Sequence, residues 1–257
     1  MKKKVKTGRT ELQEALIANP IYDNAFKYMM EDRKVASTFI STVIGEKIVE
    51  LSSAPQEHVK TENSDVPEKS LSVYRLDFVA RIQTGEGLKT VMIEVQKVSL
   101  NTDIMRFRSY LGGQYQNDSN SYPDSQKNIH AMPIYCIFVI GDGIGIEGVP
   151  VIKVDSRITD AATSRELTVP HNEFIEGLHH RTWIVQVPEL KGRRSNDLEI
   201  LLSIFDQANR MNDRRILNIK EEHFPEEYSP IIRRLQQAAA NRKIREAMLN
   251  EDYVLEH

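Results

Sequence analysis

Three polar residues of a predicted β-hairpin have the types and spacing that metal-assisted chemistry needs. Asp77 lies in a strand that alternates apolar and polar residues, and Glu94 and Gln96 lie two apart in the strand that follows. If the chain reverses at Gly85-Glu86, Asp77 falls directly opposite Glu94, and Arg75 falls opposite Gln96. Cross-strand neighbours hold their Cβ atoms about 4.5–5.5 Å apart, so the two carboxylates would lie side by side.

Two carboxylates at that separation repel each other unless a cation lies between them. Mg²⁺, which takes oxygen ligands at about 2.0–2.1 Å, suits such a pair. A cation held there activates water and stabilises charge that develops on a phosphate, and Gln96 could orient the water by hydrogen bonding. The alternative is an exposed polar face of a hairpin, in which Asp77 pairs with Arg75 or Arg81.

Hydrophobic patterns predict the elements that must position these residues. Besides the two hairpin strands, we expect a helix that Asn19 caps and Pro20 opens, and a second helix that stops at Gly45. After the hairpin, an amphipathic helix is followed by an apolar strand. The remaining expected elements are strands at 48–53, 133–140, 149–155 and 182–187, and helices at 33–43, 101–117, about 196–211 and 225–249.

Composition limits the class of protein. The chain has 257 residues, 40% of them hydrophobic, and its net charge is −3. Cys136 is the sole cysteine, which excludes a disulfide framework and favours a reducing cytoplasm. No apolar run is long enough for a membrane span, so we expect a cytoplasmic protein with no membrane partner.

Charge and pattern also divide the chain. Residues 1–18 are expected to form a flexible basic arm, 19–190 the main α/β domain, and 191–254 a purely helical extension; 255–257 resemble a tag remnant. The main domain carries the acidic excess. The basic residues of the extension have acidic neighbours, which favours a solvated face over a surface that follows DNA or a partner helix. These basic residues are Arg233, Arg234, Arg242, Lys243 and Arg245.

The hairpin and its flanking helices resemble a known family. Residues 75–78 (RLDF) and 93–97 (IEVQK) resemble the PD-(D/E)XK nuclease core in the variant where Glu-x-Gln replaces Glu-x-Lys. Residues 19–32 and 106–115 resemble the flanking motifs of the PD-(D/E)XK nuclease family transposases, which are related to recombination-promoting nucleases. The resemblance covers roughly residues 19–140 well. It implies an α/β fold with a restriction-endonuclease-like core, a mixed central sheet flanked by helices, ahead of the C-terminal helical extension.

The resemblance also implies roles for the hairpin residues. Asp77 and Glu94 would bind Mg²⁺, with Mn²⁺ as a second option, and the Val95 carbonyl would join them as a ligand. Gln96 stands where lysine normally polarises the attacking water.

Two helices are expected to contribute further side chains. Asp23 and Lys27, at i and i+4, could supply an extra acid and the missing cation, or simply form an intrahelical ion pair. Arg106, Tyr110 and Gln114 form a polar stripe; in nucleases with this resemblance the helix faces the site and can contact phosphate, the alternative being a solvated face.

The sequence therefore predicts a Mg²⁺-dependent DNA endonuclease linked to recombination or mobile DNA. The competing hypothesis is a catalytically inactive, nuclease-like module that binds DNA or protein. Cleavage of RNA is not excluded by any residue. In either case the long C-terminal helix favours self-association, most simply a homodimer.

Overall fold

The computed structural model describes residues 14–53, 74–85, 87–98, 104–118, 120–123, 125–169 and 172–256. For residues 74–77, 94, 96–98, 104–106, 110 and 254–256, the description covers the backbone alone. The expected arm at residues 1–13 and the expected loop at 54–70 lie outside the described residues.

The described chain forms strands and helices in a mixed order. The strands are β1 (Glu14–Ala18), β2 (Lys47–Ser53), β3 (Tyr74–Thr84), β4 (Gly87–Val98), β5 (Ser121–Pro123), β6 (Ile129–Ala131), β7 (Ile134–Ile140), β8 (Val151–Val154), β9 (His180–Gln186) and β10 (Ile216–Lys220). The α-helices are α1 (Asp23–Met30), α2 (Arg33–Ile44), α3 (Ile104–Gln116), α4 (Glu173–Gly177), α5 (Asp197–Leu202), α6 (Ser229–Ala240) and α7 (Arg242–Glu256).

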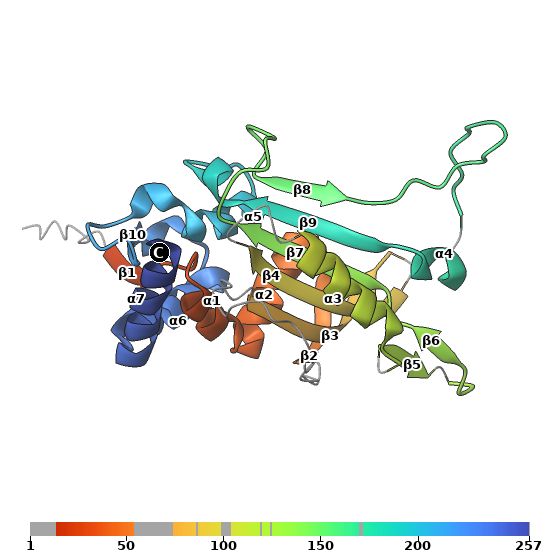
Figure 1. Ribbon diagram of the computed structural model, residues 1–257, viewed down its shortest axis with the longest axis horizontal. Helices are drawn as coiled ribbons and strands as arrows, with labels where there is room; N and C mark the ends of the chain where they lie inside the picture. Colours follow the sequence, from red (N-terminus) through yellow and green to blue (C-terminus); the bar gives the residue numbers. More distant parts are fainter. Residues whose placement is uncertain are drawn as a thin grey trace, which may run out of the picture.

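A six-stranded mixed sheet in the order β2-β3-β4-β7-β9-β8 forms the centre of the molecule (Figure 1). β2, β3 and β4 pair antiparallel, β4, β7 and β9 pair parallel, and β8 pairs antiparallel with β9. Two small antiparallel pairs, β1-β10 and β5-β6, lie outside it. The prediction of a mixed central sheet flanked by helices is confirmed.

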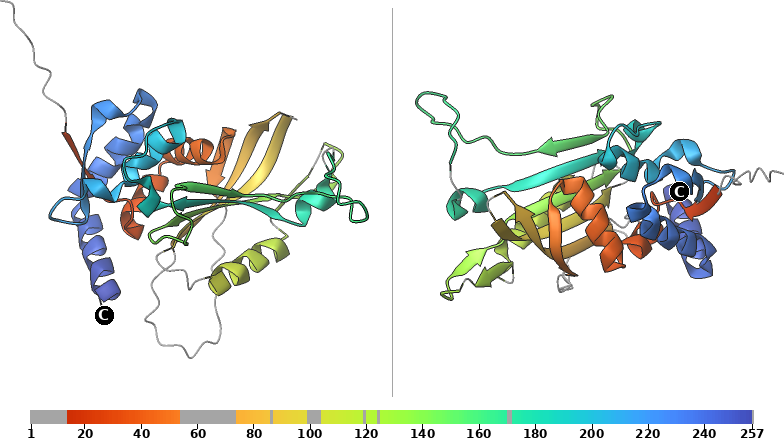
Figure 2. Two further views of the ribbon diagram at one scale, coloured as in Figure 1. Left: turned by 90° about the horizontal axis from the view of Figure 1, so that it is seen from above. Right: turned by 180° about the vertical axis from the view of Figure 1, so that it is seen from behind.

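Helices cover the two faces of the sheet. α2 packs on one face, where Phe39 and Ile40 join Ile93 and Ile137 of the sheet in a continuous buried core. α3 lies on the opposite face, as seen when the molecule is viewed from above (Figure 2). There Leu111 of α3 packs with residues of β7 in a separate apolar cluster.

The second expected helix is confirmed with its two ends. Asp32 begins α2 because its side chain accepts hydrogen bonds from the backbone N–H groups of Lys34 and Val35. Gly45 ends it in the left-handed region at φ 73°, a conformation that costs glycine little because it has no Cβ atom.

The beginning of the chain differs from expectation. Residues 14–18 belong not to a flexible arm but to β1, which pairs antiparallel with β10. Asn19 does not cap a helix, because its amide Nδ2 donates to Gln207 and to the Arg214 carbonyl, each at 2.9 Å. Helix α1 begins only after Tyr22, without a side-chain cap from that residue.

The extension after residue 190 is not purely helical. It contains β10, because Ile216–Lys220 completes the pair with β1. Asn196 caps α5 as expected, yet the helix ends at Leu202 rather than near Met211.

The long helix expected at 225–249 is divided in two. Asn241 is extended, with φ −80° and ψ 115°, and ends α6. Its side chain accepts from the Lys243 N–H at 3.0 Å, which begins α7. None of the helices in the described part of the chain has both the length and the hydropathy that crossing a bilayer demands.

The extension shares its core with the sheet. Phe205, which follows α5, packs against Phe26 of α1 and Phe39 of α2, with ring centroids 6.2 and 5.9 Å apart. Leu235 of α6 belongs to the same buried cluster. The residues expected to form a separate extension therefore complete the core of the main domain.

Candidate active site at the β3–β4 hairpin

The hairpin has the register that the sequence predicts. Asp77 pairs directly with Glu94, and Arg75 pairs with Gln96. The ladder is continuous from Tyr74↔Lys97 to Thr84↔Gly87, with no bulge between. Gly87, at φ 125°, lies at the turn, where a side chain would be strained. The backbone therefore brings positions 77 and 94 as close as neighbouring antiparallel strands allow.

Strand alternation assigns these positions to one face of the sheet. Phe78, Ile93 and Val95 contribute to the core that α2 covers. Since successive residues of a strand alternate between faces, positions 77, 94 and 96 belong to the other face. The side chains of Asp77, Glu94 and Gln96 lie outside the described part of the structure.

The parallel neighbour β7 independently identifies this face. Glu94 is the register partner of Cys136, and Gln96 is the partner of Phe138. Cys136 and Phe138 pack with Leu111 and Phe107 of α3. The candidate site thus lies on the α3 face of the sheet, where helix and strands meet through apolar contacts.

Helix α3 carries the predicted phosphate-contacting stripe. The backbone places Arg106 and Tyr110 in α3, while their side chains lie outside the described residues. Gln114, the third member, is half-buried, and its Oε1 accepts from Asn120 Nδ2 at 2.7 Å. Because this bond ties Gln114 to the turn after α3, the amide helps to shape that turn whatever it contacts besides.

Helix α1 carries Asp23 and Lys27, and it contacts both β3 and the C-terminal helix α7. Asp23 is half-buried, whereas Lys27 is exposed. The contact with β3 brings α1 next to the strand of Asp77. The roles of Asp23 and Lys27 at the hairpin stay predictions.

A residue that the sequence analysis did not consider, Glu251 of α7, anchors the start of α1. Its carboxylate accepts from the Asp23 N–H at 2.8 Å and from the Asn24 N–H at 3.0 Å. Asn24 Nδ2 donates to the same group at 2.5 Å. A carboxylate satisfies the unpaired N–H groups and opposes the positive end of the helix dipole. No sequence pattern near Asp23 signals this contact, because the partners are more than 220 residues apart.

A buried hydrogen bond next to this anchor joins α7 to the segment before α1. The Tyr22 hydroxyl donates to Asp252 Oδ1 at 2.7 Å, and Arg214 Nη2 lies 3.0 Å from the same oxygen. Burial, and then the hydrogen bond to Asp252, raise the pKa of Tyr22 far above its usual range. The phenol therefore stays protonated and acts as a donor.

Metal ligation by other groups has no support in the described residues. Among them, no cluster of three or more His, Cys, Asp or Glu side chains is placed to hold a metal ion. That set omits the side chains of Asp77 and Glu94. Comparison of the chain with known protein families, with curated proteins and with solved structures found no match.

Proposed function

We propose that the protein is a metal-dependent endonuclease that hydrolyses DNA phosphodiester bonds, linked to recombination or mobile DNA. The observation that carries the proposal is the backbone register of the hairpin. It sets Asp77 opposite Glu94, with Gln96 two residues further along β4, on the face that α3 covers. The resemblance of this hairpin and its flanking segments to PD-(D/E)XK nucleases supports the same reading.

The donor set fits Mg²⁺, or Mn²⁺ in its place. Asp77, Glu94 and the Val95 carbonyl would hold the ion with oxygen donors alone, which is what a hard divalent cation prefers. When bound, the ion would lower the pKa of water and offset negative charge on the phosphate.

The chain itself supplies orientation. Gln96 would hold the attacking water by hydrogen bonding, with no charge of its own. Arg106 and Tyr110 would position the phosphate from α3, where an arginine fork matches two phosphate oxygens. Asp23 and Lys27 would add an acid and a cation from α1.

A second candidate function is a nuclease-like module that binds DNA without cutting it. The observation that favours it is Gln96, a neutral amide where the resembling nucleases carry lysine. An amide cannot polarise water as strongly as an ammonium group, so loss of turnover would leave a binding surface intact.

The first prediction concerns cleavage. Supercoiled plasmid is incubated with the wild type in Mg²⁺, Mn²⁺ or EDTA, beside Glu94→Ala and Asp77→Ala. We expect metal-dependent nicking that each variant reduces by at least about a hundredfold, the scale of losing a group that stabilises transition-state charge. Glu50→Ala is the matched control, because Glu50 is an exposed acid of β2 that pairs with Arg81 at 3.7 Å.

The outcomes separate the two candidates. Equal nicking by the wild type and Glu94→Ala would contradict the assigned site. If neither protein cuts and calorimetry detects no binding of Mg²⁺ at millimolar concentration, the binding module replaces the enzyme. The melting temperature of Asp77→Ala in metal-free buffer should equal or slightly exceed that of the wild type, because one of two repelling carboxylates is gone.

A further inference from the structure

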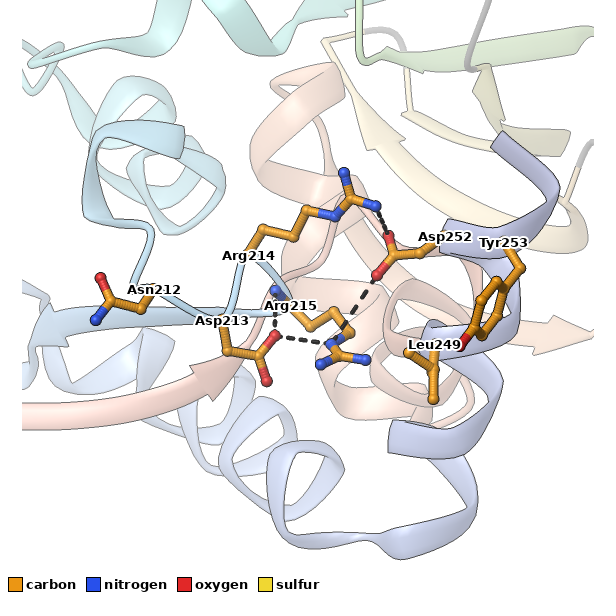
Figure 3. Close-up of a pocket in the computed structure, with 7 residues that line it drawn as sticks. All are labelled: Asn212, Asp213, Arg214, Arg215, Leu249, Asp252 and Tyr253. Carbon is orange, nitrogen blue, oxygen red and sulfur yellow. Dashed lines mark hydrogen bonds and ion pairs between the residues drawn. The ribbon is translucent and has the colours of Figure 1, made fainter. Parts of the chain in front are cut away.

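Two adjoining cavities form a groove between helix α7 and the turn that leads into β10. Their volumes are about 420 and 460 Å³, and both are lined by Asp213, Arg215 and Leu249. Arg214 lines the first cavity, and Arg242 and Arg245 line the second. We call this surface the arginine groove, defined by Arg214, Arg215, Arg242 and Arg245. Figure 3 shows the turn and α7 facing each other across its first cavity.

The groove brings together arginines from two elements about 30 residues apart in the chain. The basic residues of α7 alone have acidic neighbours, which favours a solvated face. The fold changes this interpretation, because Arg214 and Arg215 of the turn are added to Arg242 and Arg245 of the helix. Four guanidinium groups on one concave surface form an arrangement suited to a ligand that carries several negative charges.

Carboxylates hold part of this array in place. Asp213 Oδ1 lies 2.7 Å from Arg215 Nε, and Asp252, only 9% exposed, holds Arg214. Glu246 lies 2.7 Å from Arg242 Nε. Three carboxylates face four guanidinium groups, so one formal positive charge is left over. Hydrogen bonding to Arg215, with help from the charge of Arg245, lowers the pKa of Asp213, so that this acid stays ionised and keeps its hold on Arg215.

The arginines of α7 are accessible to a large ligand. The Arg242 side chain is 90% exposed, and its contact with Glu246 engages Nε among five N–H donors. Arg245 is exposed and forms no ion pair with any residue that the structure describes. On the turn, Arg214 is 48% exposed.

The groove is mechanically connected to the hairpin. Glu251 fastens α7 to the start of α1, and α1 contacts β3, the strand of Asp77. α7 and α3 also project from the same side of the central sheet (Figure 2). A helix is about 10–12 Å wide with its side chains, and phosphates follow each other every 3.4 Å along one DNA strand, so only a few nucleotides would separate the two places.

We propose that the arginine groove binds the phosphodiester backbone of the DNA substrate at a short distance from the hairpin. The inference rests on the proposed nuclease function and extends its DNA contacts to the α7 side of the molecule. Arginine forks would engage successive phosphates, while Leu249 and Tyr253, 39% and 59% exposed, would contact the sugars.

The test is DNA binding under conditions in which no cleavage can occur. The affinity of a fluorescent duplex two helical turns long is measured by anisotropy in EDTA across a series of salt concentrations. The variant is Arg242→Gln/Arg245→Gln. The control is Arg233→Gln/Lys243→Gln, which removes the same charge from exposed residues that do not line the groove.

We expect the groove variant to bind DNA about tenfold more weakly than the wild type, with the slope of log affinity against log salt reduced by about 1.8 for two lost phosphate contacts. The control should stay within about twofold. Arg242→Lys/Arg245→Lys should restore most of the affinity, which shows that the loss follows charge and not misfolding.

Equal losses in the two Gln variants, or no loss in either, would overturn the proposal. So would an altered molecular mass in light scattering with unchanged DNA affinity, since the groove would then hold a second copy of the chain. Plasmid nicking tests the enzyme separately. A wild type that nicks DNA while the groove variant binds normally refutes the groove alone, and a groove effect without nicking refutes the enzyme alone.

Discussion

At the scale of single residues, the hairpin places unlike functions on adjacent positions. Ile93 and Val95 are fully buried toward α2, while Glu94 between them belongs to the α3 face. The same backbone that buries one residue therefore presents the next to a different environment. A buried core on one side makes the register hard to shift, because a slip by one residue would turn every apolar side chain outward.

A second residue-scale feature is the contact between α3 and the first residue of β9, His180. Tyr115 Oη lies 3.2 Å from His180 Nδ1, and Phe107 packs edge-on against the same ring at 6.2 Å. Burial, and then the nearby His179, lower the pKa of His180. The neutral ring is therefore the form that suits the fold.

The second prediction follows from that lowered pKa. An unfolded chain binds a proton at His180 more readily than the folded chain does, so the free energy of unfolding falls as pH drops through about 6.5, the unfolded value. Urea unfolding of the wild type and His180→Gln between neutral and mildly acidic pH measures the effect. The variant should lose less stability on acidification, whereas His223→Gln, an exposed histidine outside this contact, should follow the wild type. Parallel curves for all three proteins would contradict the prediction.

At the scale of elements, α1 depends on α7 for its N-terminal cap. Tyr22 offers no side-chain cap, and α1 is only eight residues long, so its first N–H groups rely on Glu251. Short helices are marginal by themselves and need such partners. The orientation of Asp23 and Lys27 is thus set from the far end of the chain.

The third prediction concerns this cap. Glu251→Ala should lower the free energy of unfolding by about 1.5–3 kcal/mol, because backbone donors lose a charged acceptor. Equilibrium urea unfolding measures the change. Glu246→Ala, which removes an exposed partner of Arg242 from the same helix, should cost no more than about 0.5 kcal/mol. Similar losses in both variants would show that Glu251 acts as an ordinary surface charge.

At the scale of the whole molecule, the two ends of the described chain close one common core. β1 and β10 pair although about 200 residues separate them, and α6 packs on β1. Ile17 of β1 is fully buried in the same cluster as Phe39 and Ile137. We therefore expect the extension and the main domain to unfold together.

The fourth prediction tests that unity with neighbouring residues of β1. Ile17→Ala should destabilise the whole protein by about 2–5 kcal/mol, because it leaves a cavity in the shared core. Leu16, 53% exposed, is the matched control, and Leu16→Ala should cost less than about 1 kcal/mol. Thermal unfolding should remain a single transition in both variants. Two separate transitions in Ile17→Ala would mean that the extension has a core of its own.

The sequence by itself determined the features that depend on near neighbours. The hairpin register followed from two alternating strands and a two-residue turn, and the ends of α2 followed from Asp32, the residue before Arg33, and from Gly45. In these cases the interacting groups are close in the chain, so residue type and spacing decide the outcome.

Only the tertiary structure decided the contacts between distant segments. Asn19 looked like a helix cap and instead bonds to Gln207, and residues 14–18 looked like an arm and instead form a strand. The cap that Glu251 gives α1, and the meeting of Arg214 with Arg245 across one groove, have no local signature. Each is set by which surfaces the common core brings together, a choice that depends on burial across the whole chain and not on the pattern of any one segment.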